Sequence, residues 1–346
     1  MAALFRHLTV KSRGIAGLRR SISTTSSGSN YAFAFDIDGV LIKGNRTIPQ
    51  AKRSVPYVLL TNGGGVTEAK KAEQISQMLD IEIRPEQVVL SHSPMRQLAT
   101  KYKEKQVLVI GGKGLSCYHV ARGYGFNRVV VPEDIHNWNP SAWPYSQPSE
   151  ALTSGKYDFS ETPIDAVMVF HDARDWGRDL QLILDVLCSE NGIVGSLRKD
   201  YSLQNIPIYF SNNDIIWSTD FPAPRMGQGS FKVAVERLYE TLTGFQLKST
   251  SFGKPHATTY AYAERTIQSL GSNSGKNEGR PRVYAVGDNP AADIKGANAY
   301  GWTSILVRTG VFVGPGNSPI YPADAVCDNV EEAVLWAIEQ EESSKR

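Results

Sequence analysis

Cysteine is scarce in this sequence. The 346 residues contain three cysteines, Cys117, Cys188 and Cys327, which lie far apart and form no C-x-x-C pair. Neither a disulfide framework nor a zinc site is predicted from so few and such scattered thiols, and a reducing compartment fits. The chain also lacks any run of about 18 apolar residues, so we predict no transmembrane anchor.

Acidic residues are missing from the beginning of the chain, where the first carboxylate is Asp36. Residues 1–30 contain five basic residues and many serines. This composition is typical of a mitochondrial transit peptide, with a disordered basic tail as the alternative, so we predict a mitochondrial protein, in the matrix. Removing those five cations from the formal net charge of +2 leaves −3 for the rest, which disfavours a nucleic-acid partner.

An aromatic and apolar run, residues 31–35, precedes two carboxylates in the sequence D-I-D-G, residues 36–39. The run has the composition of a strand buried on both faces of a parallel sheet. Gly39 lets the backbone turn, so that Asp38 can come back over Asp36 at the end of the strand. Two acids in this place predict a site, although the same pattern occurs in calcium loops and in plain turns.

A second apolar run, residues 57–60, leads into Thr61, Asn62 and three glycines that begin at Gly63. Glycines give a bound anion close access to backbone N–H groups, and the Thr61 hydroxyl can donate as well. The stretch therefore predicts a phosphate cradle, with a flexible glycine turn as the alternative.

The connection between these two runs is short for a parallel crossover, which needs about a dozen residues or more and usually a helix. Ile48 to Pro56 allow a turn or so of helix before the proline stops it. Either the crossover is stunted or the sequence has lost part of an exon.

The rest of the chain alternates strands with helices. Helices are predicted over 67–79, with Thr67 as N-cap, and over 177–187, 230–243, 258–270 and 330–342; strands are predicted at 88–91, 107–110, 166–170, 206–210, 281–286 and 302–307. This alternation predicts an α/β fold with a doubly wound, Rossmann-like parallel sheet.

Two details of this pattern concern the strand at 107–110 and the helix over 230–243. The strand at 107–110 begins a second domain, and the G-G-K-G that follows it lacks the spacing of a P-loop, so we interpret Lys113 as part of a strand-to-helix turn. The helix over 230–243 is amphipathic, and we place five residues on its buried side: Val233, Val235, Leu238, Tyr239 and Leu242.

Polar groups follow three separate strands of the predicted sheet: Asp36 with Asp38, Thr61 with Asn62, and Asp288 with Asp293. Open parallel sheets build their sites at the carboxyl ends of the strands, so these groups can converge. Clustered carboxylates in a cleft need a cation to balance their charge. All-oxygen ligands favour Mg²⁺, and Lys254 supplies a second positive charge. Ordinary salt bridges are the alternative for Lys254, Asp288 and Asp293.

Four motifs stand in order along the chain: D-I-D-G-V (36–40), L-T-N-G-G (60–64), G-K-P (253–255) and G-D-N-P-x-x-D (287–293). They resemble the four motifs of the haloacid dehalogenase superfamily of phosphotransferases. The long piece between the second and third motifs is similar to the class IIA arrangement, which has a cap inserted there. The amino-acid sequences of these motifs are also similar to those of the cat eye syndrome critical region protein 5 family of mitochondrial haloacid dehalogenase-like hydrolases.

The resemblance implies a division of the chain. Residues 31–90 would form the first part of the core domain, 91–225 an inserted α/β cap domain, and 226–346 the second part of the core. The relatives carry a full helix between the first two motifs, where this chain has the short connection described above.

The resemblance also implies roles for the acids and the lysine. Asp36 would be the nucleophile that forms an aspartyl-phosphate, and Asp38 the general acid and then base. Lys254 would neutralise charge on the moving phosphoryl group. Asp288 would bind Mg²⁺ together with Asp36 and the main-chain carbonyl of Asp38, whereas Asp293 would orient a metal-bound water or Lys254.

For the phosphate itself, the resemblance implies that Thr61 and the amide of Asn62, beside Gly63, hold the phosphoryl oxygens. The cap would close over the site and select a small substrate. Five cap residues are candidates for selecting the substrate, and each is as readily a turn or salt-bridge residue: Asp172, Arg174, Asn213, Asp214 and Arg225.

These observations predict a Mg²⁺-dependent phosphatase that acts on a small phosphorylated metabolite. The resemblance adds a link to mitochondrial glycerophospholipid metabolism. The alternatives are a catalytically weak ligand-binding or scaffold protein that keeps the site, and a phosphomutase with the same aspartyl-phosphate. The sequence leaves the substrate and the oligomeric state open.

Overall fold

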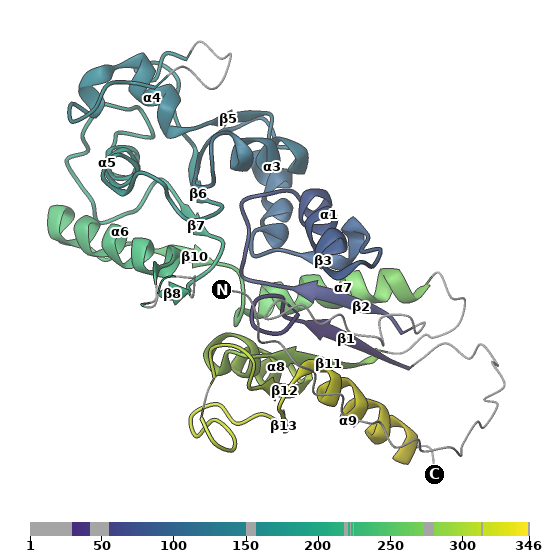
Figure 1. Ribbon diagram of the computed structural model, residues 1–346. Helices are drawn as coiled ribbons and strands as arrows, with labels where there is room; N and C mark the ends of the chain where they lie inside the picture. The colour runs from purple at the N-terminus through teal and green to yellow at the C-terminus, as the bar shows by residue number, and fades with distance from the viewer. Residues whose placement is uncertain are drawn as a thin grey trace, which may run out of the picture.

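The structure is a computed structural model, and it describes residues 30–41, 55–149, 157–217, 221, 223, 225–272, 280–312 and 314–344. The expected transit peptide therefore lies outside the described residues, as does most of the short connection from Ile48 to Pro56. The described chain forms two parallel sheets, of six and five strands, and one two-stranded hairpin (Figure 1).

The six-stranded sheet contains the strands on which the predicted motifs lie. Its order is β13-β12-β11-β1-β2-β3, with every pairing parallel. The bounds are Tyr31–Phe35 for β1, Tyr57–Leu60 for β2, Val88–Val89 for β3, Arg282–Gly287 for β11, Thr303–Val307 for β12 and Ala325–Cys327 for β13. Numbered within this sheet, the order is that of a doubly wound Rossmann fold, which confirms the predicted fold class.

Helices cover both faces of this sheet, because its strands are apolar on both sides. On one face, α1 (Glu68–Leu79) and α9 (Val330–Ser343) pack over a cluster that includes Phe33, Phe35 and Val286. On the other, α7 (Ala257–Ser272) and α8 (Lys295–Tyr300) pack over Val58 and Ala285. Thr67 caps α1 as predicted, since its side chain accepts from the N–H of the third helical residue.

The five-stranded sheet has the order β10-β7-β6-β4-β5, and it too is wholly parallel. Its strands are β4 (Gln106–Ile110), β5 (Arg128–Val130), β6 (Ala166–Val169), β7 (Ile208–Phe210) and β10 (Ser249–Ser251). The other α-helices of the described chain are α2 (Ala99–Tyr102), α3 (Ser116–Tyr124), α4 (Pro132–Trp138), α5 (Trp176–Leu187) and α6 (Gln228–Thr243). A hairpin pairs β8 (Ile216–Trp217) with β9 (Arg225–Met226).

The second sheet extends further along the chain than predicted. Helix α6 packs into the hydrophobic cluster of this sheet through Phe231, Val235 and Tyr239, and β10 is its edge strand. The chain therefore stays with the second sheet to about Ser251, and the predicted boundary at 225 falls inside that layer. The predicted buried side of α6 is also wrong in part, because Val233, Leu238 and Leu242 are exposed.

Among the described residues, we find no helix that combines the length and the apolar character needed to cross a membrane.

Candidate active site

Asp36 lies directly after β1, the central strand beside β11. Its backbone N–H donates to the carbonyl of Val286 at 2.9 Å, which continues the sheet pairing, and its side chain is buried. The chain then turns at Gly39, whose φ is +86°. A Cβ at Gly39 would lie 2.4 Å from Oδ2 of Asp288, so the close approach of this turn to β11 requires glycine. Asp38, at the turn, is exposed.

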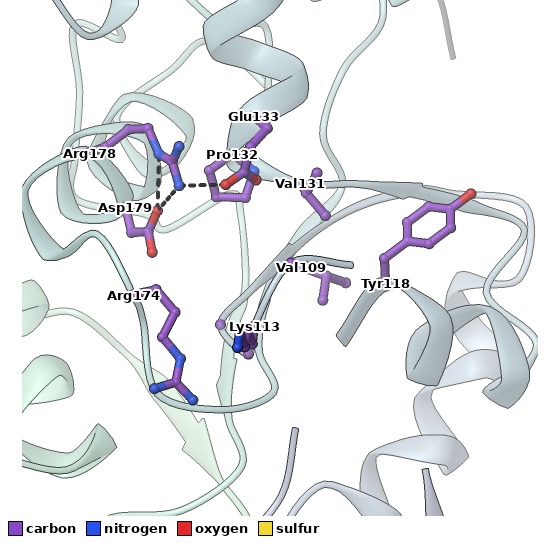
Figure 2. A pocket seen from close by; sticks show the side chains of 12 residues that line it. Val109, Lys113, Tyr118, Val131, Pro132, Glu133, Arg174, Arg178 and Asp179 are labelled. Atoms are coloured by element: carbon purple, nitrogen blue, oxygen red, sulfur yellow. Dashed lines mark hydrogen bonds and ion pairs between the residues drawn. The ribbon is translucent and has the colours of Figure 1, made fainter. Parts of the chain in front are cut away.

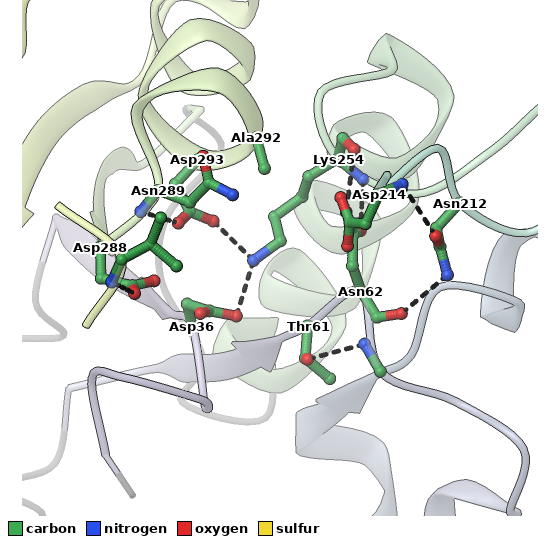
Figure 3. Close-up of polar contacts among 12 residues, drawn as sticks. Asp36, Thr61, Asn62, Asn212, Asp214, Lys254, Asp288, Asn289, Ala292 and Asp293 are labelled. Carbon is green, nitrogen blue, oxygen red and sulfur yellow. Dashed lines mark hydrogen bonds and ion pairs between the residues drawn. The ribbon is translucent and has the colours of Figure 1, made fainter. Parts of the chain in front are cut away.

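Lys254 lies between two of the predicted carboxylates (Figure 3). Its Nζ is 2.7 Å from Oδ1 of Asp36 and 2.6 Å from Oδ1 of Asp293, and all three side chains are buried. Burial opposes the charged form of Lys254, but Asp293 and Asp36 outweigh it and raise the pKa of the ammonium. The lysine is therefore a permanent positive charge at the carboxyl edge of the first sheet.

Asp36, Asp288 and Asp293 each place a carboxylate oxygen within 4.8 Å of the other two. One ammonium cannot balance three buried carboxylates. Burial, offset in part by Lys254, accordingly raises the pKa of Asp36, and burial together with Asp293 raises the pKa of Asp288 to about 6. The set contains only oxygen donors, as a hard divalent cation requires.

The hydrogen bonds distinguish the three carboxylates. Asp293 uses both oxygens, because Oδ1 accepts from Lys254 and Oδ2 accepts from the backbone N–H of Asn289 at 3.0 Å. Asp288 uses Oδ2 to accept from the backbone N–H of Val311 at 2.5 Å. Asp36 and Asp288 thus retain an oxygen that a cation could bind, whereas Asp293 is engaged in holding Lys254. Asp293 lies in a single π-helical turn, Pro290–Ile294, a feature often found at functional sites.

The predicted phosphate cradle follows β2 at the same edge of the sheet. Thr61 is buried, and its hydroxyl oxygen accepts from the backbone N–H of Gly63 at 2.9 Å, which leaves the O–H free to donate. The backbone N–H of Thr61 itself pairs with the carbonyl of Val89 at 3.0 Å. The Thr61 hydroxyl is therefore fixed in position at the edge where Asp36 and Lys254 lie (Figure 3).

Asn62 has a role that the sequence did not predict. Its Oδ1 accepts from the backbone N–H of Lys254 at 2.7 Å, and its Nδ2 donates to the Lys254 carbonyl at 3.0 Å and to Oδ1 of Asp214 at 3.0 Å. Nδ2 of Asn212 donates to the Asn62 carbonyl at 3.2 Å. The side chain of Asn62 is thus occupied in fixing Lys254, and its backbone N–H is what is left for a ligand. Asn212 carried no signal in the sequence beyond its place at a strand end.

The five candidate cap residues lie in different places. Asp214 reaches the site through Asn62, and burial raises the pKa of its carboxyl. Nδ2 of Asn213 lies 2.7 Å from Nε2 of His256. Asp172 and Arg174 follow β6, and Asp172 is 3.8 Å from Nε2 of His171. Arg225 lies in the β8–β9 hairpin, with its guanidinium 4.3 Å from the ring centroid of Phe221.

Two family models match the chain. The model described as haloacid dehalogenase-like hydrolase matches residues 33–127, and the one described as HAD-hydrolase-like matches residues 251–333. Together they include the cradle, the lysine and the second acidic turn.

Two curated relatives match over nearly the whole chain. A mitochondrial hydrolase of Saccharomyces cerevisiae is 40% identical, over 93% of this chain and 99% of the relative. A fusion protein of Schizosaccharomyces pombe, described as cardiolipin synthase (CMP-forming) and mitochondrial hydrolase, is 41% identical over 96% of this chain, which spans 58% of the length of that relative.

Solved structures share the fold. The crystal structure of a 4-nitrophenylphosphatase from Thermotoga maritima aligns with a TM-score of 0.58 over 88% of this chain and 97% of the other, at 16% identity. The two parallel sheets, the order of the motifs and the relative of Saccharomyces cerevisiae all indicate the same family. The chain belongs to the haloacid dehalogenase-like hydrolases, in the capped class IIA group.

Proposed function

We propose that this enzyme is a Mg²⁺-dependent phosphatase that hydrolyses a small phosphorylated metabolite through an aspartyl-phosphate on Asp36. One observation carries the proposal: Lys254 lies between Asp36 and Asp293 at 2.7 and 2.6 Å, with Asp288 in the same cluster. This arrangement presents a carboxylate nucleophile beside a fixed cation, and it has a surplus of negative charge that a metal would balance.

Asp36 and Asp288 would hold the metal, since each keeps a carboxylate oxygen that is not engaged in the hydrogen bonds described above. When bound, Mg²⁺ would supply positive charge that favours the ionised form of Asp36 and screens the incoming phosphate. The Thr61 hydroxyl and the N–H groups of the cradle would orient the phosphoryl oxygens, and Lys254 would stabilise the charge that develops on them.

In the first step an oxygen of Asp36 bonds to phosphorus as the bond from phosphorus to the leaving oxygen breaks, and Asp38 gives its proton to that oxygen. In the second step Asp38 takes a proton from water, whose oxygen bonds to phosphorus and releases phosphate, so that the Asp36 carboxylate is regenerated. Asp38 suits both tasks because it is exposed at the turn, where it can reach the leaving group and water.

We also propose a location and a metabolic setting. The relatives are described as mitochondrial, and the basic, acid-poor residues 1–30 agree with import into the matrix. One relative joins a hydrolase to a cardiolipin synthase in a single chain. This fusion supports a substrate from mitochondrial glycerophospholipid metabolism.

The test is phosphate release by the purified protein from 4-nitrophenyl phosphate and from a panel of alkyl phosphates, with Mg²⁺ or with a chelator. We expect activity that requires Mg²⁺ and is abolished in Asp36→Asn. Asp38→Asn should lose about 10²–10⁴-fold on alkyl phosphates, whose leaving oxygen needs a proton, and less in the first step with 4-nitrophenyl phosphate.

A folded protein that binds Mg²⁺ and these phosphates but releases none would favour the ligand-binding alternative. Transfer of the phosphoryl group to a second position of the same substrate, without free phosphate, would indicate a phosphomutase.

A further inference from the structure

The second sheet has a binding position of its own. Numbered within that sheet, its strands stand in the order 5-4-3-1-2, so the direction of winding changes between β4 and β6. Open parallel α/β sheets bind ligands at this kind of position, in the crevice outside the carboxyl ends of the two strands. The residues that follow β4 and β6 are therefore the place to look for a ligand.

A pocket of about 420 Å³ lies there (Figure 2). It is lined by the G-G-K-G turn after β4 (residues 111–114), by Val131 to Glu133 after β5, by Arg174 after β6, and by Arg178 and Asp179 in the first turn of α5. Its volume is in the range of small-molecule sites, and Val109 and Tyr118 give it apolar and aromatic walls.

The charges in this pocket are divided between paired and unpaired groups. Arg178 is engaged with three carboxylates, at 2.7 Å from Glu133, 3.3 Å from Asp179 and 4.0 Å from Asp175. Lys113 and Arg174 are exposed, and within the described part of the chain neither side chain has a hydrogen-bond or ion-pair partner. The pocket therefore presents two cations that are available to a ligand.

The G-G-K-G turn is shaped for close approach. Gly111, Gly112 and Gly114 have φ values of +100°, +80° and +56°, which side chains disfavour. A Cβ at Gly111 or Gly112 would meet the carbonyl oxygen of His171 at 2.0 Å or Oγ of Ser116 at 2.4 Å, so these two glycines let the turn pack closely against its neighbours. Gly114 has no atom within 4 Å of such a Cβ, so an anionic group can come close to the backbone there, beside Lys113.

The same edge of the second sheet adjoins the phosphate cradle. A Cβ at Gly65 in the cradle would lie 2.3 Å from Cδ2 of His171. His171 follows Phe170, which is the residue directly after β6. The loop from His171 in turn contacts the G-G-K-G turn, because the Gly112 N–H donates to the carbonyl of Asp172 at 3.1 Å. One loop thus contacts both the cradle and the pocket, and Arg174 belongs to that loop.

From this placement we infer that the pocket receives the leaving group of the substrate, and that this leaving group carries a second anionic group bound by Lys113 and Arg174. The inference rests on the proposed phosphatase function. The second anion is a phosphate, a phosphodiester or a carboxylate, since each offers the oxygen acceptors that an ammonium and a guanidinium bind.

The experiment compares substrates of equal length. The substrates are alkyl phosphates with chains of three to eight carbons, and each carries a second phosphate, a carboxylate or a hydroxyl at the far end of the chain. The value of kcat/KM is measured for each substrate with saturating Mg²⁺. At one or more lengths, we expect a phosphate or carboxylate end to raise kcat/KM about tenfold or more over the hydroxyl end, as one or two charged hydrogen bonds predict. The better of the two anions identifies the chemistry of the second group.

Lys113→Met and Arg174→Met should each reduce this preference for an anionic end, and the double variant should bring the ratio to about one. Both positions are exposed, so these variants should fold. Lys199→Met, which removes an exposed cation outside the pocket, is the matched control and should keep the wild-type ratio.

Equal kcat/KM for anionic and hydroxyl ends at every length would overturn the inference, as would a preference that survives the double variant. Failure of the phosphatase function itself is recognised separately, because the wild-type protein would then release no phosphate from 4-nitrophenyl phosphate or from any member of the series.

Discussion

Lys254→Met removes the ammonium that lies between Asp36 and Asp293 and keeps much of the side-chain volume. Two buried carboxylates then face each other without their common partner. Loss of one partner from a buried ion pair costs about 3–5 kcal/mol. Two carboxylate oxygens within 4.8 Å repel by about 3 kcal/mol at an effective dielectric constant near 20. These two free-energy values agree on the size of the expected loss in stability.

We therefore expect the free energy of unfolding of Lys254→Met to fall by about 3–5 kcal/mol in chelator at pH 8. The assay is urea unfolding followed by tryptophan fluorescence. Mg²⁺ should restore part of the loss, because it binds the folded state and balances the same charge. Phosphate release should fall about 10²–10³-fold or more even with Mg²⁺.

The double variant Lys254→Met, Asp293→Asn separates charge from packing. It removes one of the two repelling carboxylates, so it should be more stable than the single variant by about 2–3 kcal/mol. The reasoning is refuted if Lys254→Met in chelator unfolds at the same urea concentration as the wild type. It is also refuted if the double variant is no more stable than the single one.

Two further predictions concern the cradle and the second sheet. Gly65→Ala should lower both stability and kcat, because φ is +78° and the new Cβ would meet His171 at 2.3 Å. Gly244→Ala is the control: φ is +79° and no atom lies within 4 Å, so only the backbone cost of the positive φ should appear. Equal losses of unfolding free energy in the two variants, measured by urea unfolding, would contradict this. Burial raises the pKa of Asp179 to about 7, against 3.8 ordinarily, so the folded state holds more protons than the unfolded state between about pH 4 and 7, and stability should fall as pH rises through that window. In Asp179→Asn this slope should be shallower, and identical slopes in the two proteins would refute the assignment.

The convergence of the acids was predictable from the sequence. Asp36 and Asp288 directly follow apolar runs that form β1 and β11, and the carboxyl ends of neighbouring parallel strands lie at one edge. The approach of Lys254 to Asp36 and Asp293 confirms the cluster. The catalytic and metal-binding roles of these residues stay predictions until activity is measured.

The hydrogen bonds of the Asn62 side chain with Lys254 and Asp214 could not be predicted from the sequence in the same way. It joins residues that are 152 and 192 positions away in sequence, and an asparagine next to glycines is equally suited to a turn. The extent of the second sheet was missed for a different reason. Strand β10 has the sequence Ser249-Thr-Ser, which has no apolar alternation, so the register with β7 alone identifies it.

Helix α6 shows the limit of periodicity in one element. Phe231, Val235 and Tyr239 recur every four residues and pack on the second sheet. Leu238 and Leu242 have the same spacing on a neighbouring stripe and are exposed. Both stripes satisfy the helical period, so the sequence could not decide between them without the position of the sheet.

Asn62 joins the cradle, the lysine and the second sheet. Its side chain binds both the N–H and the carbonyl of Lys254, and the same Nδ2 holds Asp214, which follows β7. The position of the Lys254 ammonium therefore depends on the loop that ends β7 as well as on the first sheet. A shift of that loop would move the cation relative to the carboxylates, which the first sheet holds. One residue of the cradle therefore links the second sheet to the charge balance at Asp36.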